Sequence, residues 1–104
     1  MYNITQYSYD KLDELNKNIG HPVYFIKPSI NKKIRVYRFN KLIADIGGKK
    51  EDGTFYLDYP NYIIKDGLEI ANERRRLYYE RHKNEPDIKD GEVTPAWFAK
   101  WFLW

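Results

Sequence analysis

The expected fold of this chain depends on residues 33–47, which read Lys33-Ile34-Arg35-Val36-Tyr37-Arg38-Phe39-Asn40-Lys41-Leu42-Ile43-Ala44-Asp45-Ile46-Gly47. Apolar and polar side chains alternate on both sides of Asn40, a pattern typical of two strands joined by a turn. We therefore predict a β-hairpin over Lys33–Phe39 and Lys41–Gly47. The alternation directs five side chains to the core: Ile34, Val36, Leu42, Ala44 and Ile46. Arg35, Tyr37 and Phe39 then share the opposite face.

Helices and further strands are expected on both sides of this hairpin. In chain order they are a helix over Tyr9–Asn18 capped by Ser8 and ended by Gly20, a strand over Val23–Ile26, a strand over Thr54–Leu57, a helical turn over Asn61–Lys65 capped by Asp58, a helix over Leu68–Lys83 and an aromatic helix over residues 94–104 capped by Thr94. Residues 84–93 form a mobile, acidic connector. The pattern predicts one α+β domain over residues 1–104, with an antiparallel sheet of three to four strands packed against helices.

The composition narrows the class of protein. The 104 residues suffice for one core, and 17% of them are aromatic. The absence of cysteine excludes a disulfide scaffold and thiolate metal sites. We find neither a signal peptide nor an apolar run of about 20 residues that could span a membrane. An intracellular protein is therefore expected.

Positive charge is concentrated in one part of the chain. Residues 27–50 contain eight Lys and Arg residues but only one acidic residue, Asp45. The net charge of the whole chain is only +3, so the remainder is acidic on balance. This asymmetry predicts one positive surface and indicates nucleic acid or another polyanion as a partner.

The hairpin carries the first candidate binding site. Its basic and aromatic candidates are Lys32, Lys33, Arg35, Tyr37, Arg38 and Lys41. Cations neutralise phosphates and rings stack on bases, so this mixture suits single-stranded or backbone-directed binding. The alternative is a solvated edge strand whose charges prevent sheets from associating.

The helix over Leu68–Lys83 carries three arginines without an acidic neighbour at helical spacing: Arg74, Arg75 and Arg81. Arg75 projects among apolar side chains, which favours an internal Arg–Asp pair with tyrosine stacking. Arg74 and Arg81 could equally be structural or hold phosphates, and we take them as secondary nucleic-acid contacts.

The C-terminal segment carries an indole stripe formed by Trp97, Trp101 and Trp104. Such an apolar helix is expected to pack on the sheet and close the core. The competing interpretation is an exposed anchor for a partner protein, because Trp dominates interface cores.

Signals for catalysis are weak. His21 and His82 are the only histidines, and Gly47-Gly48 lacks the remaining features of a phosphate-binding loop. We therefore expect no enzymatic activity, no cofactor and no metal site. A metal-dependent nuclease, the remaining enzymatic alternative, would need carboxylates clustered near His82.

The order of short motifs along the chain also resembles a known group. The motifs are Tyr7-Ser8-Tyr9, Ile26-Lys27-Pro28-Ser29 with Asn31-Lys32-Lys33, Ile43-Ala44-Asp45-Ile46-Gly47, Asp58-Tyr59-Pro60-Asn61-Tyr62, Glu73-Arg74-Arg75-Arg76-Leu77-Tyr78 with Arg81-His82, and Leu103-Trp104. In this order they resemble a family of small uncharacterised proteins of large DNA viruses and tailed phages. The resemblance implies a viral or phage origin, a fold shared along the family, and a location in the host cytoplasm or the virion. It implies no activity and no catalytic residues.

Together these observations predict a small non-enzymatic viral or phage protein that binds nucleic acid, without sequence preference, through phosphates. The alternative is a virion or host-interaction protein that docks on a viral or host partner through Trp97, Trp101 and Trp104.

Overall fold

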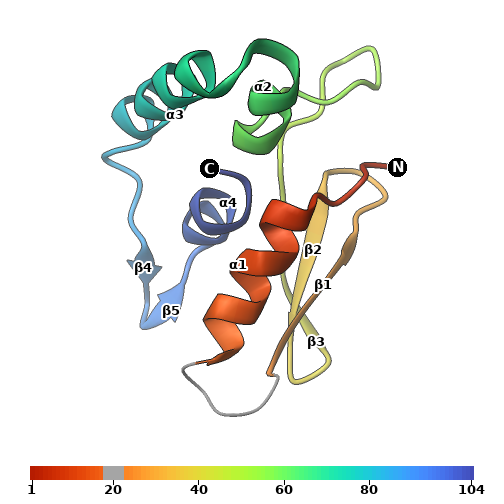
Figure 1. Cartoon of the computed structure of the whole chain (residues 1–104). Coiled ribbons are helices and arrows are strands. Elements are labelled where there is room, and N and C mark those ends of the chain that lie inside the picture. The colour runs from red at the N-terminus through yellow and green to blue at the C-terminus, as the bar shows by residue number, and fades with distance from the viewer. Residues whose placement is uncertain (18–22) are drawn as a thin grey trace.

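The computed structural model describes residues 1–17 and 23–104, whose path is drawn in Figure 1. The elements are α1 (Gln6–Lys17), β1 (Tyr24–Pro28), β2 (Ile34–Arg38), β3 (Lys41–Ile46), α2 (Tyr59–Asp66), α3 (Leu68–Arg81), β4 (Ile88–Lys89), β5 (Glu92–Val93) and α4 (Pro95–Leu103). Strands β1, β2 and β3 form an antiparallel sheet in that order, and β4 pairs with β5 in a separate hairpin. The predicted α+β class is confirmed.

Two helices cover one face of the sheet. Helix α1 packs on β1, α4 packs on β3, and the two helices contact each other. Helices α2 and α3 form a closely packed pair at the top of Figure 1. The buried core joins all these layers through Tyr2, Ile26, Ile34, Val36, Ala44, Ile46, Tyr59, Ala71, Phe98, Phe102, Leu103 and Trp104. The prediction that the C-terminal segment closes the core is therefore confirmed.

The central hairpin turns at two residues with positive φ, Phe39 (50°) and Asn40 (63°). Such a two-residue turn suits the twist of the flanking strands, and asparagine tolerates this backbone region well. A bulge in β3 shifts the register of the hairpin by one residue: Val36 opposes Ala44, whereas the next residue, Tyr37, opposes Leu42. Leu42 is consequently 45% exposed, and its predicted place in the core is wrong.

Helix caps depend on local side chains. Asp58 accepts a hydrogen bond from the Asn61 amide and begins α2, and Thr94 accepts one from the Trp97 amide and begins α4, as predicted. Ser8 is not the cap of α1. The Thr5 hydroxyl accepts from the Ser8 amide at 3.4 Å, while the buried Ser8 hydroxyl donates to the Phe102 carbonyl at 2.7 Å.

Two segments differ from the expected elements. Residues 54–57 form no strand, and only Phe55 makes an isolated bridge, with Lys49. The stretch 84–93 contains the short hairpin of β4 and β5. The expected helix end at Asn18 and Gly20 lies outside the described residues.

The free edge of β1 is occupied by a side chain of α1. The Asn16 carboxamide oxygen accepts hydrogen bonds from the amides of Val23 and Tyr24, and its nitrogen donates to the Tyr24 carbonyl at 3.0 Å. One asparagine thus takes the place of a neighbouring strand at this point and fastens α1 to the sheet.

Candidate functional site

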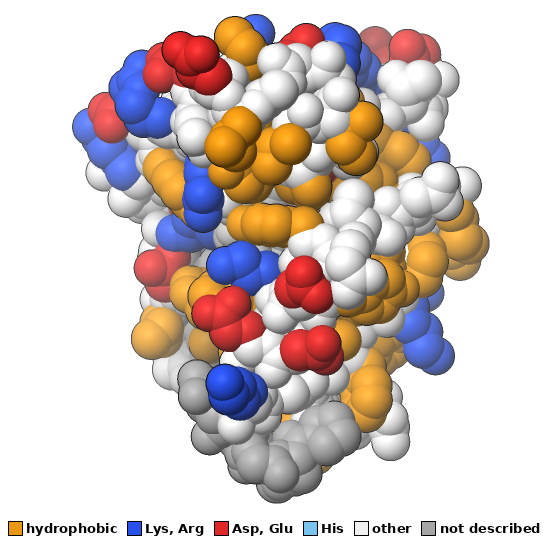
Figure 2. Space-filling view, in the orientation of Figure 1, with side chains coloured by type: hydrophobic (Ala, Val, Ile, Leu, Met, Phe, Trp, Pro, Cys, Tyr) orange, Lys and Arg blue, Asp and Glu red, His pale blue; other side chains and the backbone are white. Residues whose placement is uncertain are grey.

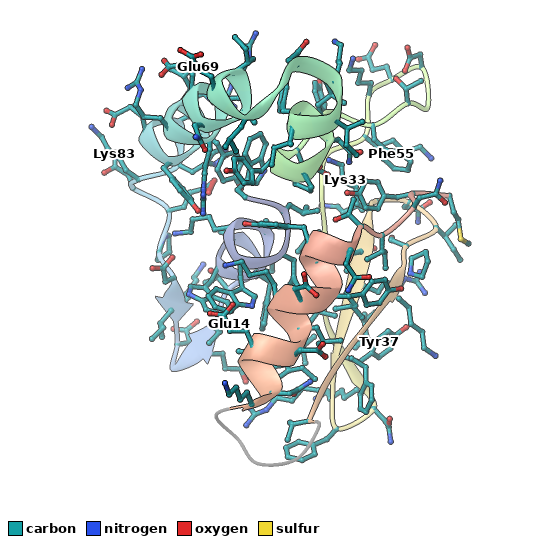
Figure 3. All side chains as sticks on the ribbon, viewed as in Figure 1. Glu14, Lys33, Tyr37, Phe55, Glu69 and Lys83 are labelled. Atoms are coloured by element: carbon teal, nitrogen blue, oxygen red, sulfur yellow. The ribbon has the colours of Figure 1, made fainter. Side chains whose placement is uncertain are left out.

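A buried ion pair lies beside a large cavity, which Lys33 helps to line. Lys33 Nζ lies 2.9 Å from Asp58 Oδ2, and the two side chains are 3% and 0% exposed. The Tyr2 hydroxyl donates to the same carboxylate oxygen at 2.6 Å, and Asn61 Nδ2 donates to the other at 2.8 Å. Figure 3 places Lys33 between the sheet and α2. Asp58 therefore caps α2 and neutralises the cation at the same time.

This pairing corrects one candidate of the sequence analysis. Lys33 was expected on the binding surface, but its ammonium group is withdrawn from solvent and held by a carboxylate. Burial lowers the pKa of Lys33, and the attraction of Asp58 only partly opposes this shift. Lys33 is a structural residue of the cavity lining.

The cavity beside this pair has a volume of about 650 Å³ and is lined by rings and cations. We call it the tyrosine cleft and define it by Lys32, Tyr56, Tyr62, Tyr78, Arg81, His82 and Trp104. Gly47, Gly48, Leu57, Ala99 and Leu103 complete the lining together with Lys33. Within the described part of the chain, no Asp or Glu lines it. The cleft is thus suited to a ligand that is both negatively charged and aromatic.

The ring system of the cleft is centred on Tyr78. Its ring stacks on Trp104, with 4.4 Å between centroids and 9° between planes, and lies 4.2 Å from the His82 ring. Burial raises the pKa of Tyr78 to about 12. Tyr56, by contrast, is 57% exposed and offers its ring to the solvent.

Two further cations lie against lining rings. Lys50 Nζ is 5.5 Å from the centroid of Tyr56, and the Arg74 guanidinium is 5.6 Å from the centroid of Tyr62. Both side chains belong to exposed residues and can reach a ligand at the rim. On the same side, His82 Nδ1 lies 2.8 Å from Glu85 Oε2, so the His82 ring already has an acidic neighbour.

The glycine pair at the wall is required by close packing. Gly47 has a φ of +100°, and a Cβ atom there would come within 2.5 Å of the Lys33 side chain. A Cβ atom on Gly48 would come within 2.8 Å of the Tyr56 ring. Glycine at both positions therefore allows Lys33 to reach Asp58 and Tyr56 to lie on the wall.

The chain matches no family model, no curated protein and no solved structure. The viral or phage origin therefore stays a prediction. Within residues 1–17 and 23–104, no group of three or more His, Asp or Glu side chains is arranged to hold a metal ion. No helix of the same residues combines the length and apolar character needed to cross a bilayer.

The structure distributes the remaining sequence candidates over separate surfaces. Lys32 and Arg81 line the tyrosine cleft, and Arg74 lies at its rim. Arg35 and Tyr37 point to the sheet face opposite the helices, where Lys27 Nζ lies 5.6 Å from the Tyr37 centroid.

Arg38 and Lys41 lie at the turn end of the hairpin, beside a smaller cavity next to Glu92 and Val93 of β5. Strand alternation and the bulge thus divide the expected single hairpin surface into several parts. Only Lys32 and the two helix arginines come together.

The sequence analysis missed Tyr56, Tyr62 and Tyr78 of the cleft, and Lys50 beside Tyr56. A usable signal was present, because tyrosines recur at positions 56, 59 and 62 directly after the basic segment. That this segment and the end of α3 line one cavity depends on the tertiary fold, and no local pattern indicates it.

Arg75 and the tryptophans also differ in part from expectation. Among the described residues, no carboxylate lies within 4.0 Å of Arg75, so the expected Arg–Asp pair is absent. The expected tyrosine stacking is present, with the guanidinium 4.5 Å from the Tyr59 centroid. Trp104 is only 9% exposed, and Trp97 and Trp101 are half-buried.

Proposed function

We propose that the protein binds single-stranded nucleic acid through the tyrosine cleft, without strong sequence preference. One observation carries the proposal: a cavity of about 650 Å³ combines four aromatic rings with Lys32 and Arg81 and has no lining carboxylate among the described residues. Non-specific single-strand binding needs this combination of backbone neutralisation and ring stacking.

Each part of the cleft has a role in this proposal. Lys32 and Arg81 hold phosphates on the two sides of the cleft, and Lys50 and Arg74 extend the positive rim. Tyr56 is the exposed ring on which a base stacks. Tyr78 and Trp104 stack on each other and form a rigid inner wall.

The burial of the C-terminal aromatics supports this proposal over docking through the tryptophans. An anchor for a partner protein needs an exposed stripe, whereas Trp104 is 9% exposed and Phe98 and Phe102 are buried below it. The proposed protein is non-enzymatic, and its binding would be phosphate-directed.

The test is fluorescence anisotropy with a labelled single-stranded oligonucleotide, titrated at several salt concentrations. We expect Lys32→Glu with Arg81→Glu to weaken binding at least about tenfold and to lower the salt slope by about 2. The control is Arg38→Glu with Lys41→Glu, which changes the charge equally at the turn end of the hairpin. Equal losses in both pairs, or no loss in the cleft pair, would contradict a site in the cleft.

Stacking is tested separately with Tyr56→Ala. We expect an affinity loss of about fivefold or more with an unchanged salt slope, because stacking on a base involves no counterion release. Tyr37→Ala, on the outer sheet face, is the matched control and should leave the affinity unchanged. A larger loss for Tyr37→Ala would move the binding site to that face.

A further inference from the structure

A second cavity lies beyond Trp104, whose ring lines both cavities. It has a volume of about 300 Å³ and lies where α1, α3 and α4 meet. We call it the Arg75 pocket; its lining consists of Tyr7, Lys11, Arg75, Tyr79, Asp87, Trp97, Lys100, Trp101 and Trp104. Figure 2 shows Lys and Arg side chains together with hydrophobic and acidic ones on this face.

Two polar atoms of the Arg75 pocket lack hydrogen-bond partners. Arg75 Nε and the Tyr7 hydroxyl are both buried, and neither has a partner among the described residues. The guanidinium lies 4.5 Å from the Tyr59 centroid and 5.7 Å from that of Tyr79. Buried donors without acceptors are costly, so a ligand that supplies an acceptor would bind favourably here.

The charges around the pocket favour an anion. Lys11 Nζ lies 4.5 Å from the Trp101 centroid, and its acidic neighbour, Glu14, is 3.9 Å away with a 60% exposed side chain. Lys100 is already paired with Asp87. Arg75 is therefore the cation of the lining that has no carboxylate within 4.0 Å among the described residues, and Lys11 has only the exposed Glu14 as its partner.

The walls favour a flat ligand. Trp97 and Trp101 stack with 5.4 Å between centroids and 10° between planes. Trp101 Nε1 donates to the Lys11 carbonyl at 3.0 Å, which fixes its indole against α1. A fixed aromatic wall beside Arg75, which has no carboxylate partner among the described residues, suits an aromatic molecule with a negatively charged substituent.

We propose that the Arg75 pocket binds a small planar aromatic anion, with its carboxylate or phosphate group on Arg75 and Lys11 and its ring along Trp97 and Trp101. This site is separate from the tyrosine cleft and does not depend on nucleic-acid binding. Carboxylate and phosphate share the recognition chemistry, because arginine binds both in a bidentate manner.

The test uses two anionic probes and their neutral counterparts. Adenosine 5′-monophosphate is compared with adenosine, and indole-3-acetate with indole, while NMR follows the indole N–H signals of Trp97 and Trp101. We expect at least one anion to bind with a Kd below about 1 mM and its neutral counterpart about tenfold more weakly. The preferred anion identifies the charged group.

Variants locate the site. Arg75→Gln is expected to weaken the preferred anion at least about tenfold. The matched control is Arg76→Gln, which removes the same charge from an exposed position of α3 that is paired with Glu73. Lys11→Gln provides a second variant on α1 and should weaken binding severalfold even if Arg75→Gln fails to fold.

Several results would overturn the inference. They are the absence of binding by both anions at about 1 mM, equal binding of the neutral probes, and equal effects of the Arg75 and Arg76 variants. Lys32→Glu with Arg81→Glu should leave the small anion bound while weakening the oligonucleotide, so a failure of one site is distinguishable from a failure of the other.

Discussion

Lys33 and Arg75 are two cations that the fold withdraws from solvent in different ways. Lys33 meets the fully buried carboxylate of Asp58, which also accepts hydrogen bonds from Tyr2 and Asn61. Arg75 lies against the ring of Tyr59, has no carboxylate within 4.0 Å among the described residues, and retains a buried nitrogen without an acceptor. The charge of a buried cation that has its own anion is already neutralised, whereas the charge of one without an anion can be neutralised by a ligand.

The largest effect should come from Asp58→Ala. The change leaves Lys33 buried without its carboxylate and removes the cap of α2, so we expect a loss of about 3–5 kcal/mol in the free energy of unfolding. Urea denaturation measures this loss. Asp66→Ala, at the exposed end of α2, is the control and should cost less than about 0.5 kcal/mol. A loss below about 1 kcal/mol for Asp58→Ala would show that the pair contributes little.

The two cations can then be compared directly by replacing each with methionine. Lys33→Met leaves the Asp58 carboxylate buried without its cation and should cost about 3 kcal/mol. Arg75→Met removes a cation that has no anion, so we expect the free energy of unfolding to change by less than about 1 kcal/mol. Urea denaturation of each variant, compared with the parent protein, gives both values. Equal costs would break the distinction between the two sites.

The smallest effect is a pH dependence that involves Lys33 alone. Its pKa in the folded state lies below the ordinary value of 10.5, because burial disfavours the charged form. Between these two pKa values the unfolded chain binds more protons, so this group's contribution to stability rises with pH in that window. The stability difference between the parent protein and Lys33→Met should therefore increase from neutral pH toward pH 10.5.

Arg75→Met is the control for this measurement. Arginine stays charged throughout the range, so the difference between the parent protein and Arg75→Met should stay flat from neutral pH to about pH 10. A flat difference for Lys33→Met up to pH 10.5 would mean that its pKa is not lowered and that the attraction of Asp58 balances or outweighs burial.

The features that the sequence predicted correctly have local causes. Asp58 and Thr94 act as caps on amides three residues ahead, and the turn at Asn40 depends on its own backbone preference. The burial of Phe98 and Phe102 follows from an apolar helix that needs cover. Each of these signals is complete within a few residues.

The features that the sequence did not predict depend on partner residues that are far away in the chain. Ser8 has the chemistry of a cap, but its hydroxyl donates to Phe102, 94 residues away. In the sequence, Lys33 resembles the other basic residues of the hairpin. In the structure, its buried ammonium group donates a hydrogen bond to Asp58, which is 25 residues away. The tyrosine cleft joins the loops after β1 and β3 to the end of α3, so no single segment contains its pattern.

The carboxamide of Asn16 has a consequence for how copies of this chain meet one another. An open sheet can grow by taking up a strand from a neighbouring molecule, which is how many fibrils begin. At the start of β1, the donor and acceptor of Tyr24 that such a strand would need are already bound by Asn16. An incoming chain would first have to displace this amide at the start of β1 and loosen the attachment of α1 to the sheet.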